Sequence, residues 1–494
     1  MHPVQRRVAS LGLLLGALGC GGGRAGTHAE HGLGASPAIE LALVVAPTDT
    51  GLSFTLSAEG ALPRRWVLQK RWAGEEEVLG HLTGPTIEGC GKTVTPPRED
   101  LGTHVGWSLA ERCRSVKLRW QVKSPKPGAL SWGWEFDPVA TDGLRTAIAE
   151  STLVLPDVPD DTRVRIEVGF AGVPAGQEAL WSLGPGPHTT TTRAARHAYF
   201  AIGRFASATD TAQQLTLEAR FAEGHFDVPA ARRDLGKLLA AEAKIFAPDR
   251  PETLRVLVVP MPHDEDADDH GTSLTGSAIL WMDGGLKWGE AQARLAAHEM
   301  FHLYLGQIID RGGDEPDERT YWFSEGFTEH YTDVVMARAK VYDAQGWLEM
   351  LRLRVRRYHQ HPQCETPNDK AEMRWGGAAI QLPYLRGSMV AAYVDAAMRR
   401  ASGGKRSLDD LMRTLLGRAR RHEAPLDSER MLGVIAAEAG KEVAATVRAV
   451  ALGGQRLTLP KDAFGPCVVV TGEGDKQDVV AAPGVDLAKC FASL

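Results

Sequence analysis

Short runs of β-branched and aromatic residues alternate with glycine and proline turns between residue 38 and about residue 200. Two clear runs of this kind cover residues 118–122 and 163–168. Such runs, bounded by turn-forming residues, are typical of β-strands. We therefore expect an N-terminal antiparallel β domain, with bounds at residues 37–200.

The pattern changes in the middle of the chain. Two further extended segments, at residues 214–221 and 254–259, flank a helical pattern at 229–245. Strands that alternate with a helix indicate a mixed α/β unit. We expect this unit to occupy residues 201–345.

Apolar residues recur at helical spacing from residue 286 almost to the end, notably in segments 388–398 and 408–416. This spacing predicts a C-terminal helical domain at residues 346–460, followed by an extension at 461–494. Two polar runs, at residues 264–270 and 310–319, are expected to form surface loops. The fold class predicted from these patterns is α+β and multidomain.

The amino terminus has the pattern of an export signal. Arg6 and Arg7 precede an apolar run at residues 8–18, which is too short to span a membrane as a mature helix. The residues before Cys20 resemble a bacterial lipoprotein cleavage box. We expect a signal peptide at residues 1–19, lipidation of Cys20 and a flexible tether at residues 20–36, with an ordinary signal cleaved nearby as the alternative.

Composition bounds the functional class. The 494 residues exceed the usual length of one domain, and the hydrophobic (43%) and charged (24%) fractions are those of a globular protein. The formal net charge of -6 comes without a strong basic stripe, so nucleic acid is not an expected partner. The expected place is the bacterial cell envelope, on the periplasmic face or the cell surface.

Cysteine usage agrees with export. Two local disulfides are expected in an oxidising compartment, Cys90 with Cys113 and Cys467 with Cys490, and Cys364 is left over. The sequence leaves the connectivity open, and it contains no C-x-x-C pair for a metal or a redox reaction.

The segment from His298 to His302 fits the pattern H-E-x-x-H inside a predicted helix. Residues four apart lie on one helix face, so both imidazoles can bind one metal ion, and Glu299 can lean over the open coordination position. The pattern also arises by chance, and lone histidines are more often packed in a core. Its meaning therefore depends on a third ligand.

A second segment supplies that ligand. Ser324 is a good helix N-cap, which would place Glu325 in the first turn of a neighbouring helix. Two imidazoles and one carboxylate form the ligand set of a hydrolytic zinc ion with one position open for water. Glu299 would then be the general base. The alternative for Glu325 is a carboxylate favoured by the helix dipole.

Three ordered blocks resemble the gluzincin metallopeptidases, and specifically the glycyl aminopeptidase family. They are His-Glu-Met-Phe-His at 298–302 with Trp-Phe-Ser-Glu-Gly-Phe-Thr at 322–328, Pro-Tyr-Leu-Arg-Gly-Ser-Met-Val at 383–390, and Gly-Gly-Lys-Arg-Ser-Leu-Asp-Asp-Leu-Met at 403–412. The resemblance covers roughly residues 199–459. It implies a β domain, a thermolysin-like catalytic domain around one Zn²⁺ ion, and a helical domain.

The resemblance also implies roles for single residues. Tyr384 would donate a hydrogen bond to the developing oxyanion. Apart from the resemblance, Glu329 lies one turn after Glu325 and is expected to orient His298. A structural tyrosine and an exposed glutamate are the alternatives. Asp409 and Asp410 are expected to be first-turn carboxylates after a Ser407 cap, and His330 and the acidic run 264–269 are expected to lie in solvent.

The chain departs from the family in two places. Family members carry an acidic residue before the zinc helix that holds the amino group of the substrate, whereas this chain has Gly-Thr-Ser-Leu-Thr-Gly-Ser at 271–277. An endopeptidase or an altered specificity is then as well supported as an aminopeptidase. We also expect no C-terminal PDZ module of the kind that many members carry, because only about 35 residues follow the segment 454–460.

The function predicted from the sequence is a zinc-dependent peptidase that acts on peptides or proteins and is held at the membrane by its lipid. The alternative is a non-catalytic binding or scaffolding lipoprotein that retains the fold.

Overall fold

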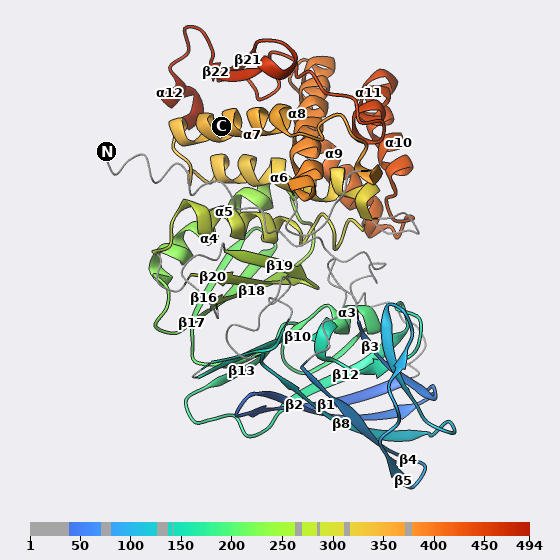
Figure 1. The fold of residues 1–494 in the computed structure, drawn as a ribbon. Helices are drawn as coiled ribbons and strands as arrows, with labels where there is room; N and C mark the ends of the chain where they lie inside the picture. Colours follow the sequence, from blue (N-terminus) through green and yellow to red (C-terminus); the bar gives the residue numbers. More distant parts are fainter. Residues whose placement is uncertain are drawn as a thin grey trace.

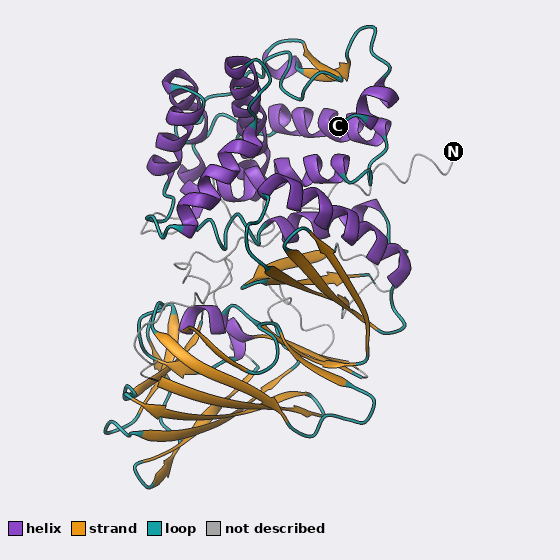
Figure 2. Cartoon of the chain, turned by 180° about the vertical axis from the view of Figure 1, so that it is seen from behind, coloured by secondary structure: helices purple, strands orange, loops and turns teal. Residues whose placement is uncertain are grey.

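A computed structural model describes residues 39–70, 81–125, 137–141, 143–261, 269–283, 287–310, 317–370 and 378–494. It stacks a β-rich N-terminal region, a central sheet with helices on one face, and a helical C-terminal region (Figures 1 and 2). The predicted α+β class is confirmed. The predicted signal at 1–19, the lipidated Cys20 and the tether at 20–36 lie outside the described residues.

The N-terminal region consists of strands that form three sheets. The sheets have the strand orders β14-β12-β1-β2-β8-β4-β5, β13-β15-β10-β9 and β11-β3-β7-β6. The strands are β1 (Ile39–Thr48), β2 (Gly51–Gly60), β3 (Arg65–Gln69), β4 (Leu82–Gly89), β5 (Lys92–Val94), β6 (Glu99–Asp100), β7 (His104–Ser108), β8 (Ser115–Lys123), β9 (Val139–Thr141), β10 (Leu144–Ile148), β11 (Leu155–Pro156), β12 (Arg163–Phe170), β13 (Glu178–Trp181), β14 (Pro187–Thr191) and β15 (Tyr199–Gly203), with short helices α2 (Ala149–Thr152) and α3 (Thr192–Arg196).

Pairing in these sheets is antiparallel except between β1 and β12, which run parallel. Alternate side chains of β1 are buried, as expected for a sheet with one face on a core. Phe54 of β2 and Trp120 of β8 are direct neighbours across the sheet, and their rings stack with centroids 5.2 Å apart. Cross-strand aromatic pairs of this kind stabilise the sheet and fix its register.

The central sheet has the strand order β16-β17-β18-β20-β19. Its strands are β16 (Phe205–Ala212), β17 (Leu215–Ala222), β18 (Glu252–Pro260), β19 (His270–Leu274) and β20 (Ser277–Met282). The inner strands β17, β18 and β20 are parallel, and both edge strands are antiparallel to their neighbours. Helix α4 (Val228–Phe246) connects β17 to β18 and begins at the N-cap Asp227, whose carboxylate accepts from the Ala230 N–H.

Both faces of the central sheet are buried. The helices α4 and α5 (Glu290–Phe301) pack on one face, and strands β10 and β15 of the N-terminal region share a smaller core with the other. This explains why β18 contains a continuous apolar run rather than an alternating one. The edge strand β19 contacts α5, which is the helix that contains His298 of the predicted zinc site.

The remaining helices form the upper half of Figure 1. They are α6 (Asp317–Arg338), α7 (Ala344–Gln360), α8 (Leu382–Ser402), α9 (Leu408–Arg420), α10 (Ser428–Glu438), α11 (Lys441–Ala451) and α12 (Leu487–Ala492), with 3₁₀ turns at Asn368–Lys370, Ala378–Gln381 and Gly474–Lys476 and a hairpin of β21 (Val468–Thr471) and β22 (Asp478–Ala481). Within the described residues, no helix combines the length and hydropathy that crossing a membrane requires.

The prediction that Ser324 begins a helix is wrong. Helix α6 already begins at Asp317, so Glu325 lies in its interior. The Ser324 hydroxyl lies 3.5 Å from the Thr320 carbonyl of the preceding turn, to which it donates. Because a serine hydroxyl can bond either to a helix start or to a carbonyl one turn back, the residue type alone does not distinguish the two positions.

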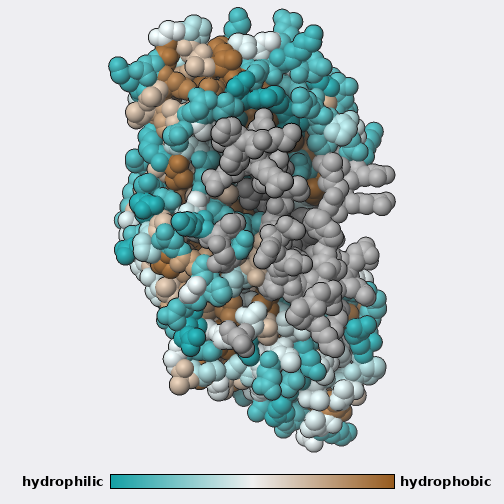
Figure 3. Space-filling model, turned by 60° about the vertical axis from the view of Figure 1, so that its left-hand side comes forward, coloured by the Kyte–Doolittle hydropathy of each residue, from teal (hydrophilic) through white to brown (hydrophobic). Residues whose placement is uncertain are grey.

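The surface is mainly hydrophilic on the face shown in Figure 3, with a hydrophobic patch at the upper end of the molecule. The C-terminal region forms that end in Figure 1. Three of the exposed large hydrophobic residues belong to its last segment, Val480, Val485 and Leu494.

Candidate metal centre

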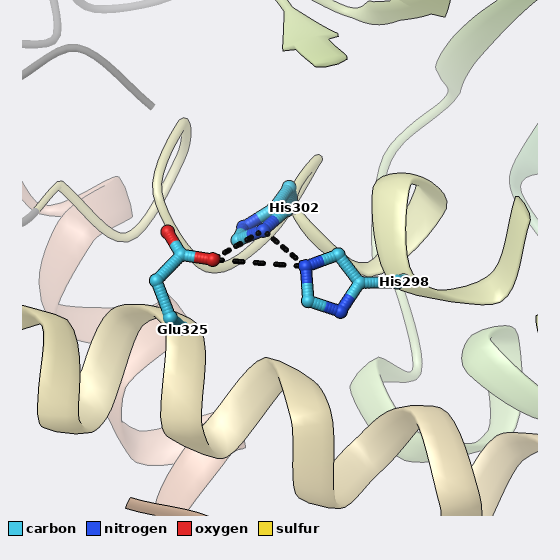
Figure 4. Close-up of side chains that lie close together, drawn as sticks. All are labelled: His298, His302 and Glu325. Atoms are coloured by element: carbon cyan, nitrogen blue, oxygen red, sulfur yellow. Dashed lines mark hydrogen bonds and ion pairs between the residues drawn. The ribbon is translucent and has the colours of Figure 1, made fainter. Parts of the chain in front are cut away.

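Three side chains from two helices meet in the interior (Figure 4). His298 lies in the last turn of α5, His302 is the residue that ends this helix, and Glu325 comes from α6. One ligand atom from each lies within 4.8 Å of the others, and all three residues are buried. The distances are 3.2 Å between the two Nε2 atoms, and 3.6 and 3.3 Å from Glu325 Oε2 to Nε2 of His298 and of His302.

The hydrogen bonds of the two imidazoles fix their tautomers. His298 Nδ1 lies 3.1 Å from Glu329 Oε2, and His302 Nδ1 lies 2.9 Å from the Leu305 carbonyl. A carboxylate and a carbonyl can only accept, so both Nδ1 atoms carry protons. In the neutral rings the two Nε2 lone pairs then face each other and Glu325. Such a cluster of acceptors is stabilised by a cation between them, and it can hold a metal ion.

The geometry fits zinc. Zn–N and Zn–O bonds of about 2.0–2.1 Å in tetrahedral geometry place neighbouring ligand atoms about 3.3 Å apart. The three observed separations lie close to this value. The two Glu325 oxygens have no hydrogen-bond partner among the described residues, which leaves their lone pairs for an ion.

The electrostatics of the centre favour a positive charge. Burial lowers the pKa of His298, but the carboxylates of Glu325 and Glu329 outweigh it and raise that pKa to about 9. Burial opposes ionisation of Glu325 as well, yet its electrostatic interaction and hydrogen bonds with the two imidazoles hold the pKa of Glu325 well below its usual range. The pocket therefore stabilises a carboxylate beside a cation.

Glu299 lies beside this centre under the edge strand of the central sheet. It is buried, and neither carboxylate oxygen has a hydrogen-bond partner among the described residues. A Cβ on Gly271 of β19 would lie 2.7 Å from Glu299 Cγ, so only glycine leaves room for this side chain. Burial raises the pKa of Glu299, which suits a group that must take up a proton.

Behind His298, a network of buried charges holds Glu329. Arg294 and Arg354 both donate to Glu329 Oε1, the latter at 2.9 Å, and Arg354 Nε donates to Asp333 Oδ2 at 2.6 Å. Glu329 is 1% exposed. A buried carboxylate that is held by two guanidinium groups keeps its position and its charge, so it can fix the His298 ring.

Tyr384 lies in the first turn of α8, near His298. It is buried, and the two rings lie nearly parallel with their centroids 6.3 Å apart. The crossing of α6 and α8 brings this turn to the metal centre. The structure thus gathers all the predicted catalytic and metal-binding residues in one place.

A sequence profile of the M61 glycyl aminopeptidase family matches residues 291–377, the segment that contains helix α6 and nearly all of α5. Over this segment the chain is similar to the glycyl aminopeptidases, in agreement with the resemblance of its sequence blocks. No curated protein sequence matches the chain at a significant level.

Solved structures show the same fold at low sequence identity. An aminopeptidase N family protein from Idiomarina loihiensis is 16% identical with a TM-score of 0.66, over 87% of this chain and 79% of that one. An M1 zinc metallopeptidase from Deinococcus radiodurans is 18% identical (TM-score 0.54, 86% and 95% covered). Leukotriene A4 hydrolase from Saccharomyces cerevisiae is 13% identical (TM-score 0.50, 83% and 66% covered). The chain therefore shares the multidomain fold of these three proteins.

The sequence interpretation missed the residues that support Glu329. Their spacing contains a signal, because Arg294 precedes His298 by four residues and Asp333 follows Glu329 by four. Residues four apart continue along one helix face, so each lies next to a site residue. Arg354 offers no such signal, since it comes from α7.

Two expectations about exposure are wrong. His330 is buried rather than in solvent, because α7 and α8 cover this part of α6. Asp269, at the end of the acidic run, is also buried, and it accepts from Gln292 Nε2 at 2.7 Å and from the Asp283 N–H at 2.9 Å. The rest of that run, residues 264–268, lies outside the described residues.

Helix α9 begins as expected, since Ser407 and Asp410 form a capping box. Asp409 has a further contact, because its carboxylate accepts from Tyr331 and from Arg338 at 3.0 and 2.7 Å.

The cysteines form two local bridges in the structure. The disulfides join Cys90 to Cys113 in the N-terminal region and Cys467 to Cys490 near the end of the chain. Cys364 is unpaired and buried. Each bridge closes a short loop and thereby limits the freedom of the unfolded chain.

Proposed function

We propose that this protein is a peptidase of the gluzincin type, which binds one Zn²⁺ ion through His298, His302 and Glu325 and hydrolyses peptide bonds with Glu299 as general base. The observation that carries the proposal is the facing pair of imidazole Nε2 atoms 3.2 Å apart, with both Nδ1 atoms engaged by acceptors. A bound zinc ion would polarise the scissile carbonyl and make water a better nucleophile at neutral pH.

The chain itself supplies the proton transfer. The Glu299 carboxylate would take a proton from the attacking water and deliver it to the nitrogen of the leaving amine. Its raised pKa and unpaired oxygens support both steps. Tyr384 is a neutral donor beside the same centre, and its hydroxyl would donate a hydrogen bond to the developing oxyanion.

The position of strand β19 is an argument for a peptide substrate. It is an edge strand of the central sheet, and its outer edge pairs with no other described strand. An extended peptide can therefore add at this edge through main-chain hydrogen bonds. On the face of β19 that contacts α5, Gly271 lies over Glu299, and Ser273 accepts from Gln307 Nε2. Because this position carries a neutral hydroxyl and no carboxylate, we propose cleavage that does not require a free amino terminus.

We also propose that the protein is exported and anchored to the membrane by a lipid on Cys20. The signal pattern at residues 1–19 and the two disulfides support this. Metabolic labelling with a fatty acid tests it: we expect label on the protein and none on Cys20→Ser, and label on both would contradict the anchor.

Peptide profiling of zinc-loaded protein tests the activity. We expect cleavage of both N-acetylated and free peptides by the native protein, and a loss of at least about 1000-fold in Glu299→Gln with its zinc retained. Equal and negligible cleavage by both zinc-loaded proteins would contradict a peptidase. Cleavage confined to free amino termini would contradict the proposed substrate range but not the chemistry.

A further inference from the structure

A pocket lies beside helix α6, on a different face of this helix from the one that carries Glu325. Its volume is about 220 Å³, and its walls come from α6, α7, α8 and the segment that precedes β21. Figure 1 shows the three helices packed together in the upper half of the molecule. The proposed zinc ligands and Glu299 are not among its lining residues, so the pocket lies outside the metal centre, although Asp333 and Arg354 of the network behind His298 line it.

The walls of this pocket are mainly apolar. The larger apolar side chains that line it include Val334 of α6, Trp347 and Leu351 of α7, and Phe464 near the C-terminal hairpin. Trp347 is fixed by its contact with the Phe491 ring of α12, at a centroid separation of 5.5 Å. An engineered apolar cavity of about 150 Å³ holds benzene, so this volume suits a ring with one or two substituents.

One buried hydroxyl group in the pocket is unsatisfied. Ser388 of α8 lines the pocket, is 1% exposed, and its Oγ has no hydrogen-bond partner among the described residues. An unpaired buried hydroxyl is costly and calls for an explanation. A ligand with one polar group would satisfy it.

The charged side chains around the pocket are already paired. Arg338 pairs with Asp409, Arg399 with Asp395, and Arg354 with Asp333. His330 also lines the pocket, and burial lowers its pKa to about 4, so its ring is neutral near pH 7. The groups left for a ligand are therefore neutral, and a charged ligand would find no free counter-charge among those pairs.

We propose that this pocket binds a small uncharged aromatic molecule that carries one hydroxyl group, with the ring between Val334 and Trp347 and the hydroxyl bonded to Ser388. The apolar walls provide affinity, and the serine hydroxyl fixes the orientation. This inference is independent of the proposed peptidase activity, because it uses none of the zinc-binding residues.

Fluorine NMR on the full zinc-loaded protein tests the proposal with two probes of the same shape, 4-fluorophenol and 4-fluorotoluene. We expect saturable binding of both, with 4-fluorophenol bound more tightly. Ser388→Ala should raise the Kd of 4-fluorophenol by about 3- to 10-fold, the loss of one neutral hydrogen bond, and leave that of 4-fluorotoluene within about 2-fold. Ala337→Leu, which fills the pocket, should abolish binding of both.

Ser402→Ala is the matched control, because this serine lies on the same helix and its hydroxyl already donates to the Met398 carbonyl. It should change neither Kd. Ser388→Ala removes an unpaired hydroxyl, so we expect its unfolding midpoint to stay equal or rise, which separates lost binding from lost folding. If 4-fluorophenol does not saturate, or if Ser388→Ala affects both probes equally, the assignment is overturned, and this holds even if Ala337→Leu fails to fold.

Discussion

Gly326 and Gly387 meet backbone to backbone where α6 crosses α8. A Cβ atom on Gly326 would lie 2.3 Å from Gly387 Cα, and one on Gly387 would lie 1.8 Å from the Trp322 carbonyl oxygen. Gly326 directly follows Glu325, the proposed zinc ligand, and Gly387 lies three residues after Tyr384. This contact therefore sets the distance between the metal centre and the predicted oxyanion donor.

Gly387→Ala should separate the two helices. We expect the free energy of unfolding to fall by about 3 kcal/mol, the upper range for overpacking, because the obstructing atoms are backbone and cannot rotate away. Chemical denaturation measures this change. Gly433→Ala in α10 is the control, since nothing lies within 4 Å of the added Cβ, and it should stabilise the protein by about 0.5–1 kcal/mol. Equal stability of the two variants would contradict the close crossing.

Gly271→Ala should displace the predicted base. The added Cβ would meet Glu299 Cγ at 2.7 Å, and a shift of about 1 Å at a catalytic group costs roughly 100-fold in rate. We expect kcat to fall by about that factor at unchanged zinc content, measured by steady-state kinetics and metal analysis. Gly169→Ala, whose nearest neighbour is a carbonyl oxygen 4.0 Å away, should leave kcat unchanged. Native kcat in Gly271→Ala would place the base elsewhere.

Glu329→Gln should weaken zinc binding. Glutamine can retain the contact to His298 Nδ1 but loses the negative charge that polarises the ring, and changes of this kind typically cost 10- to 100-fold in affinity, so we expect about that loss. Competition with a chelator measures the zinc Kd. Glu349→Gln on α7 is the control, because this exposed glutamate accepts from Arg352 and Gln345 at the surface, away from the metal centre. An unchanged Kd in Glu329→Gln would show that the network only supports folding.

Glu150 should make stability depend on pH. Burial raises its pKa from 4.5 to about 7, so the folded state holds a proton that the unfolded state releases. The protonated Glu150 therefore contributes fully to the free energy of unfolding below about pH 4.5. This contribution is lost as the pH rises to about 7, and the total loss is about 3 kcal/mol.

Urea unfolding between pH 4.5 and 8 measures this loss. Glu150→Gln cannot ionise, so its stability should fall less over this range than that of the native protein. Glu167→Gln, on an exposed position of β12, should follow the native profile. Parallel profiles for native protein and Glu150→Gln would refute the assignment.

The sequence was sufficient for the features that depend on local geometry. Helical spacing places His298 and His302 on one face whatever surrounds the helix, and Glu299 follows from the same spacing. The strands and helices in the regular patterns, such as β12 and α9, appear where they were predicted, because a period in the side chains reflects a period in the backbone.

The tertiary structure decided what depends on residues far apart in the chain. The start of α6, the burial of His330 and Asp269, and the bonds of Glu329 to Arg354 all depend on neighbouring elements that a local pattern does not contain. The same holds for Gly271 over Glu299 and for Gly326 against Gly387, where the absence of a side chain matters only because another backbone or side chain occupies its place. The sequence thus determined which residues can bind the metal, and packing determined how they are held.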